Sequence, residues 1–430
     1  MKKNSKMILD VNERPSALKW LLLSIQHVFA MFGATILVPI LVNQAAGSEV
    51  LSIPVALITS GIGTLIYIVC TKGKSPIYLG SSFAFITPMA VAFASSGKSS
   101  VFTAIMAVGI VYVIVALLIK FIGKKWLNKL LPPIIVGPMI MIIGLSLAPT
   151  AVDEIGLNLE VIPWKNVLVA VVSFLTTAYF AVRGRGFFKV IPFLLGIVAG
   201  YICSMIVGIV DYSGITSSSF LSAPAFYIPF LHYKINFGAL LTIVPIALVT
   251  ISEHIGDHKV LGSIINRDLI EDPGLDRTLM GDGLATFTAG LLGGPANTSY
   301  GENTSVVGMT KVASVWVTAL AAVIAVIFGF LGNLTAVISS IPTPVLGGVA
   351  ILLYGFISVN GLKILIQNQV DFGDTKNIVV ASTMLVLGLG GAAISLITKN
   401  MSVSISGMSL AAIIGIVLNL ILPEERKWKK

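Results

Sequence analysis

Apolar runs separated by short polar segments recur along the whole chain. Each run has about 20 residues, which is the length that an α-helix needs to cross a hydrocarbon core of about 30 Å. The pattern predicts an all-α polytopic membrane protein with fourteen spanning segments and no soluble domain. The expected segments cover roughly residues 18–42, 49–70, 79–95, 101–122, 131–149, 165–182, 188–210, 237–256, 277–292, 299–312, 313–331, 343–361, 376–396 and 403–422.

The composition supports this class and excludes others. Hydrophobic residues make up 56% of the chain and charged residues only 11%, whereas soluble domains carry about 25% charged residues. Residues 1–17 are polar and lack the apolar stretch of a signal peptide, so we expect a short cytoplasmic tail. The excess of nine positive charges is spread over the loops, which argues against a nucleic-acid partner.

The basic residues also predict the orientation of the chain. With the N-terminus inside, 24 of the 28 Lys and Arg residues fall on the cytoplasmic side, as the positive-inside rule requires. Both tails, 1–17 and 423–430, are then cytoplasmic, which needs an even number of spans. The basic residues expected outside are Lys98, Lys165, Lys234 and Lys399.

Two of the expected spans make poor helices. The stretch "YLGSSFAFITPM" (78–89) contains Gly80 and Pro88, and "GGPANTSYGENTSVVGMT" (293–310) contains four glycines, one proline and several polar residues. A broken backbone at membrane depth is tolerated only where protein buries it or where it lines a wet cavity. Broken segments at matching positions of two halves indicate the binding site of a transporter.

A weak internal repeat supports the presence of two halves. The first span contains Gln26-His27 and the eighth contains Glu253-His254, and each pair is followed by a broken segment about 50 residues later. Seven spans precede the eighth. An odd number of spans in each half predicts that the second copy is inverted relative to the first.

Glu253 and Asp257 lie at i and i+4, so they share one face of the eighth span. A buried carboxylate must face a cavity, pair with another group or take up a proton. Two carboxyls this close repel each other when both are ionised, so the pair binds one proton more readily. The alternative is that Asp257 and His258 are already solvated at the cytoplasmic edge beside Lys259.

Glu302 follows Gly301 at the start of a helical stretch, where the helix dipole favours a negative charge. Gly301 allows a ligand to approach the backbone closely. Carboxylates that accept and backbone N–H groups that donate hydrogen bonds would complement a flat ligand with N–H and C=O groups, such as a nucleobase. The alternative is a carboxylate that only caps the helix.

Other polar and aromatic residues near these positions have two interpretations each. Gln26 and His27 either order the core as a hydrogen-bonded pair or contact substrate, and Phe83 either stacks on a planar ring or only packs. His254 and His258 with two carboxylates could mimic a metal site, but they lack the HExxH pattern and a third ligand. We therefore predict no metal site. With no nucleophile and base in evidence, we also predict no enzyme.

Four stretches of this chain resemble the nucleobase-ascorbate transporter family, and within it the bacterial uracil permeases. These stretches are "LSIQHVFAMFGATILVP" (23–39), "YLGSSFAFITP" (78–88), "SEHIGDH" (252–258) and "YGENTSVVGMTK" (300–311). Glu302, Asn303, Thr310 and Lys311 fit the family signature, whereas Ser305 stands where glycine is usual.

The resemblance implies a seven-plus-seven inverted repeat in the bacterial cytoplasmic membrane. Short antiparallel strands in spans 3 and 10 would meet beside the substrate. A core domain would comprise residues 18–130 and 237–331, and a gate domain residues 131–236 and 332–422. Members of the family often dimerise through the gate, although this sequence carries no sign of a homodimer.

The resemblance also implies roles for individual residues. Glu253 and Glu302 would bind the base through their side chains, Phe83, Tyr300 and Gly301 through backbone groups, and Ala34 would line the pocket. Glu253, Asp257 and Glu302 are the candidates for carrying the coupled proton, and no other cofactor is expected. The supporting residues would be Gln26, His27, His254, Ser82, Asn303 and Thr310.

The identity of residue 302 favours one substrate. Glutamate at this position resembles the uracil carriers, whereas glutamine is frequent in carriers of xanthine and urate. The two side chains select different base edges, because a carboxylate accepts two N–H bonds but an amide offers one donor and one acceptor. The sequence therefore predicts a proton-coupled uracil importer. A purine permease with the same machinery is the alternative because Asp257 is common in purine carriers, and an anion transporter or channel of shared architecture is a more distant one.

Overall fold

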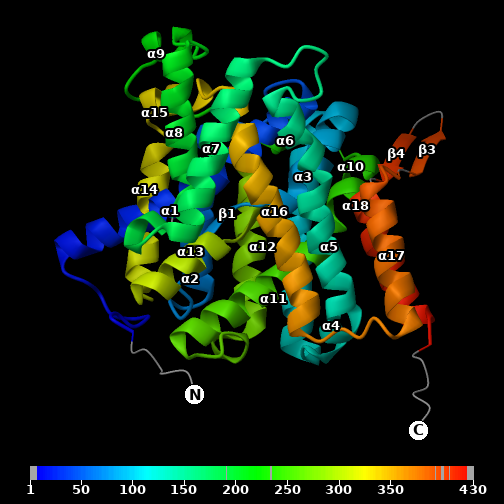
Figure 1. Ribbon diagram of the computed structural model, residues 1–430. Helices are drawn as coiled ribbons and strands as arrows, with labels where there is room; N and C mark the ends of the chain where they lie inside the picture. Colours follow the sequence, from blue (N-terminus) through cyan, green and yellow to red (C-terminus); the bar gives the residue numbers. More distant parts are fainter. Residues whose placement is uncertain are drawn as a thin grey trace.

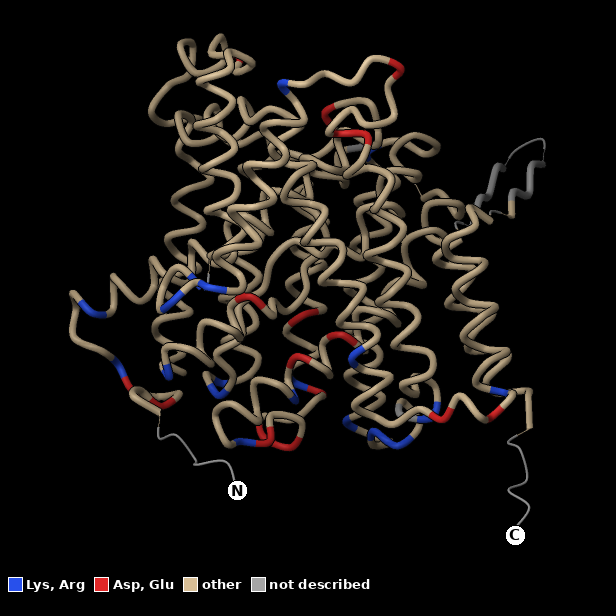
Figure 2. The backbone as a smooth tube through the Cα atoms, viewed as in Figure 1, with Lys and Arg blue, Asp and Glu red and all other residues tan. Residues whose placement is uncertain are grey.

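Most of the described chain is helical because each apolar run satisfies its backbone hydrogen bonds internally. The computed structural model describes residues 7–189, 191–232, 235–392, 394–398, 401–405 and 407–423. Long helices run side by side between two faces, and the two ends of the described chain lie on the same face (Figure 1). Lys and Arg gather toward this face, while several acidic residues lie deep among the helices (Figure 2).

One group of helices surrounds the two broken segments. Within it, α3 packs against α1 and α12, and α2 packs against α12 and α14. The group comprises α1 (Ala17–Ala46), α2 (Ile53–Cys70), α3 (Ile86–Ile122), α10 (Phe237–Ile243), α11 (Ile246–Ile265), α12 (Leu275–Leu292), α13 (Gly301–Thr310) and α14 (Val315–Phe328).

A second group of helices is built around α16. This helix packs against α5, α6, α7 and α8, while α17 packs against α5 and α18. The group comprises α5 (Pro133–Ser146), α6 (Ala148–Ile155), α7 (Trp164–Arg183), α8 (Pro192–Val207), α16 (Thr343–Gln367), α17 (Thr375–Leu389) and α18 (Gly407–Ile421).

Short elements connect these helices and form two small sheets. The helical connectors are α4 (Lys125–Leu130), α9 (Ser213–Thr216), α15 (Gly332–Ser339), η1 (Phe83–Phe85), η2 (Gly186–Lys189), η3 (Pro229–His232) and η4 (Ile270–Gly274). The strands are β1 (Leu79–Ser81), β2 (Asn297–Ser299), β3 (Ile394–Thr398) and β4 (Met401–Ile405). Strand β1 pairs with β2, and β3 pairs with β4, both antiparallel.

Seven helical stretches in the described residues are long and apolar enough to cross a bilayer, and four more apolar helices have 10–17 residues. The longest stretch, Phe83–Ile122, covers the predicted segment 101–122 and the predicted segment 79–95 from residue 83 on, whereas residues 79–81 form β1. Gly97 breaks it with a φ of 76°, a conformation that suits glycine. The structure therefore separates these two segments where the sequence predicted a boundary.

Three predicted boundaries were wrong, the ends at residues 396 and 256 and the start at residue 403. Residues 394–396 and 403–405 were expected in helices, but they belong to β3 ("ISLIT") and β4 ("MSVSI"), and in β4 apolar residues alternate with serine as in a strand. Helix α11 was expected to end at residue 256, but it continues to Ile265. Its polar residues continue the helix because they have buried partners, as the site shows.

Candidate functional site

Strands β1 and β2 cross at the centre of the first helix group. They pair in register, with Leu79 opposite Ser299 and Ser81 opposite Asn297, and every residue in both strands is buried. The pairing gives the two broken segments mutual partners for their backbone N–H and C=O groups, as burial at membrane depth requires. The short antiparallel strands predicted in the two broken segments are therefore present.

The side chain of Tyr300 fixes the end of this small sheet. Its hydroxyl donates to the Ser81 carbonyl at 2.9 Å and accepts from Thr35 of α1 at 3.2 Å. Its ring covers Gly80, where a Cβ atom would lie 2.4 Å from two ring carbons. Gly80 is thus needed for the approach, and Tyr300 ties both strands to α1.

The backbone of Tyr300 is hydrogen-bonded within the protein on both sides. Its N–H donates to the Tyr78 carbonyl at 2.9 Å, and its carbonyl accepts from the N–H of Thr304 at 3.2 Å. The Tyr300 N–H is therefore already used within the protein and does not face a ligand. The first N–H groups of α13, at Gly301 and Glu302, have no intrahelical partner because a helix start leaves them unpaired.

Helix α13 presents Gly301 and Glu302 at its start. Gly301 is exposed and Glu302 is half-buried, so this end of the helix is accessible. The positive end of the helix dipole lies here and stabilises a carboxylate or another electronegative group. Ser305, one turn later, is exposed, and its hydroxyl donates to the Gly301 carbonyl at 3.0 Å.

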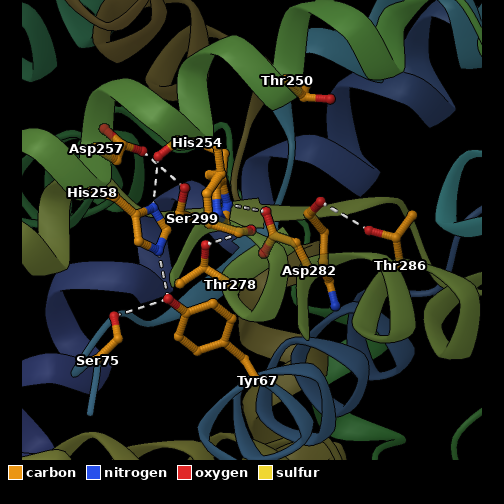
Figure 3. Close-up of polar contacts among 12 residues, drawn as sticks. Tyr67, Ser75, Thr250, His254, Asp257, His258, Thr278, Asp282, Thr286 and Ser299 are labelled. Atoms are coloured by element: carbon orange, nitrogen blue, oxygen red, sulfur yellow. Dashed lines mark hydrogen bonds and ion pairs between the residues drawn. The ribbon is translucent and has the colours of Figure 1, made fainter. Parts of the chain in front are cut away.

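Helix α11 brings Glu253 and Asp257 to the same place. Both are half-buried, and Asp257 accepts a hydrogen bond from Ser299 of β2 at 3.1 Å (Figure 3). A Cβ atom built on Gly301 would lie 3.8 Å from the Asp257 carboxyl. Glu253 is close enough to Glu302 for their charges to interact. The structure thus brings together the three carboxyls that the sequence singled out.

His258 is buried, contrary to the alternative of a solvated residue at the membrane edge. Its side chain is fully inaccessible. Its Nε2 atom lies 2.5 Å from the Tyr67 hydroxyl of α2, and its Nδ1 atom lies 2.6 Å from the His254 carbonyl (Figure 3). Because a carbonyl only accepts, Nδ1 carries a proton. The solvated interpretation of His258 was therefore wrong, and its contacts anchor α11 to α2.

His254 pairs with an acidic residue that sequence reasoning missed. Its Nδ1 atom lies 2.7 Å from a carboxyl oxygen of Asp282 in α12, and both side chains are fully buried (Figure 3). The second Asp282 oxygen and His254 Nε2 are buried without a hydrogen-bond partner among the described residues. An aspartate between two glycines inside an otherwise apolar span, "GDG" at 281–283, was the available signal.

Helix α1 contacts the site through His27. The Asn303 amide of α13 donates to the His27 carbonyl and lies within hydrogen-bond distance of its Nδ1 atom, both at 3.1 Å. His27 is buried with Asn303 as its partner, whereas its neighbour Gln26 is half-buried. Thr310 caps the other end of α13 by donating to the Val306 carbonyl at 2.8 Å. His27, Asn303 and Thr310 thus support α13, the helix that carries Glu302.

The remaining predicted residues lie around the strands and on α1. Ala34 is buried in α1, Phe83 is half-buried in η1, and Ser82 is buried with its N–H donating to the Ala296 carbonyl at 2.9 Å. The described residues contain no group of three or more His, Cys, Asp or Glu side chains placed to hold a metal ion. The site is thus a set of carboxyls and helix N–H groups beside a buried polar network.

Comparisons with known proteins agree with this architecture. A model of the Permease family matches residues 18–397. The chain is 48% identical to a uracil permease of Bacillus caldolyticus over 97% of its own length and 95% of that protein. It is 45% identical to the uracil permease of Bacillus subtilis (98% and 97% coverage) and 39% identical to that of Escherichia coli (96% and 93%).

Solved structures of other transporters share the fold at low sequence identity. The transmembrane domain of the cyanobacterial bicarbonate transporter BicA superposes with a TM-score of 0.60 at 14% identity, covering 95% of this chain and 99% of that one. The anion transporter SLC26A9 superposes with a TM-score of 0.66 at 10% identity, covering 95% of this chain and 66% of that one. At such identities the likeness concerns the fold alone.

Proposed function

Because the chain belongs to the nucleobase-ascorbate transporter family and is an integral multi-pass membrane protein, we propose that it imports uracil together with protons. The observation that carries this proposal is the meeting of α11 and α13 beside the paired strands. Glu253 lies on α11 and Glu302 at the start of α13; both are half-buried and within range of each other's charge.

The chemistry of this arrangement suits a pyrimidine base. The two N–H groups of uracil can donate to carboxylates, and one of its carbonyl groups can accept from the Gly301 N–H at the start of α13. Charge-assisted hydrogen bonds of this kind are about twice as strong as neutral ones. The curated relatives named uracil permease support uracil over a purine.

Transport requires that the site open alternately to the two sides. We assign the helices around the strands to a core domain (18–130 and 237–331) and the helices around α16 to a gate domain (131–236 and 332–422). The contacts within each group support this division. In this proposal the fourteen spans form an inverted repeat with both termini in the cytoplasm, and the core moves against the gate in the bacterial cytoplasmic membrane.

Proton coupling follows from the grouping of carboxyls. Glu253, Asp257 and Glu302 lie within electrostatic reach of one another, so all three are not readily ionised together in a site of low dielectric. Binding a proton lowers this repulsion and lets the site accept uracil. Releasing the proton on the cytoplasmic side, where the proton activity is lower, favours release of the base.

A thermal-shift panel with purified protein tests the substrate. A ligand that binds only the folded state raises its stability, so uracil should raise the melting temperature more than xanthine, uric acid or thymine at equal concentration. A larger shift with xanthine would replace uracil with a purine in this proposal.

Transport into proteoliposomes tests the coupling. We expect uracil to accumulate only with an inward proton gradient, and we expect Glu253→Gln to abolish accumulation because the amide cannot take up the proton. Uracil accumulation that persists after the gradient is collapsed would exclude proton symport. The Lys74→Ala variant, altered at an exposed ion pair, serves as the control.

A further inference from the structure

The segment before α1 is attached to the substrate helices. Residues 8–14, which we call the N-terminal strap, run parallel to residues 311–315, with a bridge between Leu9 and Val312. The Ile8 N–H donates to the Lys311 carbonyl at 2.7 Å, and the Val315 N–H donates to the Val11 carbonyl at 2.9 Å. Val11 is fully buried, so the strap is part of the folded structure.

The strap is anchored directly to the end of α13. Lys311 is the C-terminal cap of this helix, and its N–H donates to the Val307 carbonyl at 2.9 Å. The Lys311 carbonyl accepts the bond from Ile8. A helix of ten residues is marginally stable alone, so its position depends on contacts at both ends. His27 and the strands hold its start, and the strap holds its end.

The same segment also reaches the end of α11. Asp10 accepts from the Arg267 guanidinium at 2.6 Å. Arg267 is tied to the last turn of α11 because its N–H donates to the Gly262 carbonyl at 2.9 Å. Gly262 permits this close turn, since a Cβ atom there would lie 2.5 Å from the Arg267 carbonyl oxygen.

Further contacts fix the strap where it enters α1. The Arg14 guanidinium lies 4.3 Å from the ring centre of Trp20 and 5.7 Å from that of Trp316. The Trp20 indole donates to the Trp316 carbonyl at 2.7 Å, and Ser314 donates to the Glu13 carbonyl at 2.5 Å. The strap is therefore also fixed on the α1 side of its contacts with α11 and α13.

We propose that the N-terminal strap positions the substrate site by holding the far ends of α11 and α13 at a fixed separation. Helix α11 carries Glu253 and Asp257, and α13 carries Glu302, so a change at their joined ends alters the spacing of the carboxyls. Asp10 and Arg267 are positioning residues in this proposal, because they touch neither substrate nor proton. The inference rests on the proposed function, because its ligand is uracil, and its geometry rests on the hydrogen bonds of residues 8–14.

Binding of radiolabelled uracil and uptake into proteoliposomes test the proposal. Asp10→Ala and Arg267→Ala should each raise the Kd and the KM about two- to fivefold, in the range expected for an exposed ion pair, with the maximal rate unchanged. The double variant should be no worse than either single one. The exchanged pair Asp10→Arg with Arg267→Asp should recover most of the affinity.

Two further variants separate positioning from general stability. Ile8→Pro removes the N–H that donates to Lys311. Because Ile8 is 71% exposed, this substitution removes little packing. Ile8→Pro should raise the Kd for uracil about as much as Asp10→Ala does. Lys74→Ala is the matched control, because Lys74 and Asp272 form an exposed ion pair of the same 2.6 Å length on another part of the same face. Its Kd should match that of the wild type.

Hydrogen exchange of residues 301–310 gives a readout that does not need uracil. Exchange should be faster in Asp10→Ala and Ile8→Pro than in the wild type and in Lys74→Ala. If the wild type fails to bind uracil, the proposed function is wrong. The exchange pattern still tests whether the strap holds α13 in place. Unchanged exchange, or an equal rise in Kd for the Lys74→Ala control, would overturn the positioning role.

Discussion

The two helix groups bury very different residues although both consist of apolar helices. The group around the strands buries His27, His254, His258 and Asp282, and each has a hydrogen-bond partner. The group around α16 buries a single charged residue among those described, Glu154 of α6. The first group therefore holds the buried polar network of the candidate site, whereas the second group is packed almost entirely through apolar and small residues.

The packing in the second group depends on small residues. A Cβ atom on Gly348 of α16 would lie 2.3 Å from the Ala170 carbonyl of α7, and one on Gly144 of α5 would lie 2.3 Å from the Tyr354 carbonyl of α16. Small residues allow helices in a membrane to approach closely. In the proposed mechanism this group moves as one body, and close backbone contacts of this kind would hold its helices together.

The substitution expected to have the largest effect is Glu302→Gln in the polar group. The amide cannot accept two N–H bonds, and each charge-assisted bond contributes about 1.5–3 kcal/mol, so uracil affinity should fall about 100-fold or more. Equilibrium binding of labelled uracil measures this. Ser305→Ala on the same helix is the control, and we expect its affinity to stay within about threefold because it removes one exposed hydroxyl. Unchanged uracil affinity in Glu302→Gln would show that Glu302 does not bind uracil.

A pair of glycine substitutions sharpens the comparison between the groups. Gly80→Ala and Gly348→Ala both force a methyl group into occupied space, so each should lower the free energy of unfolding by about 1–3 kcal/mol. Only Gly80→Ala should also weaken uracil binding, by about tenfold, because it displaces the Tyr300 ring that joins the strands to α1. Thermal unfolding in detergent and ligand binding measure the two effects. An equal loss of affinity in Gly348→Ala would contradict the assignment of binding to one group.

The smallest effect is expected at Glu154. Both of its carboxyl oxygens are buried without a hydrogen-bond partner among the described residues, and replacing such a group with an apolar residue of similar size is often neutral or stabilising. Glu154→Leu should leave the KM for uracil within about twofold and leave the melting temperature unchanged or higher. A fivefold or larger loss of uptake would show that the second group also takes part in the chemistry.

The sequence alone predicted which residues make up the polar region, but it did not predict most of the contacts between them. The broken segments, Glu253, Asp257 and Glu302 stand out because charges and glycines are rare at membrane depth. The pairing of His254 with Asp282 and of His258 with Tyr67 joins residues from different helices, so no local pattern reveals it. Helix α11 extends past its predicted end because these distant partners compensate the burial of its histidines.

The apolar region illustrates a different difficulty. Hydrophobic periodicity locates its helices well, but it does not specify which helices touch, because most positions on each helix are apolar. The contacts of α16 depend on Gly348 and Gly144, and a glycine gives no information about its neighbour. The hairpin of β3 and β4 was missed for a related reason, because its apolar residues extend the pattern of the flanking helix.

The register between Leu79 and Ser299 has a consequence for biogenesis. The first strand leaves the ribosome long before the second, and it has no backbone partner until most of the polypeptide has been made. Ser60 and Thr64 of α2, which are made earlier, can already bind the N–H and C=O groups of Leu79, but the groups of β1 that pair with β2 must until then be held by water or by the insertion machinery. Assembly of the binding site is therefore a late event of synthesis, and a chain released before β2 emerges would lack it altogether.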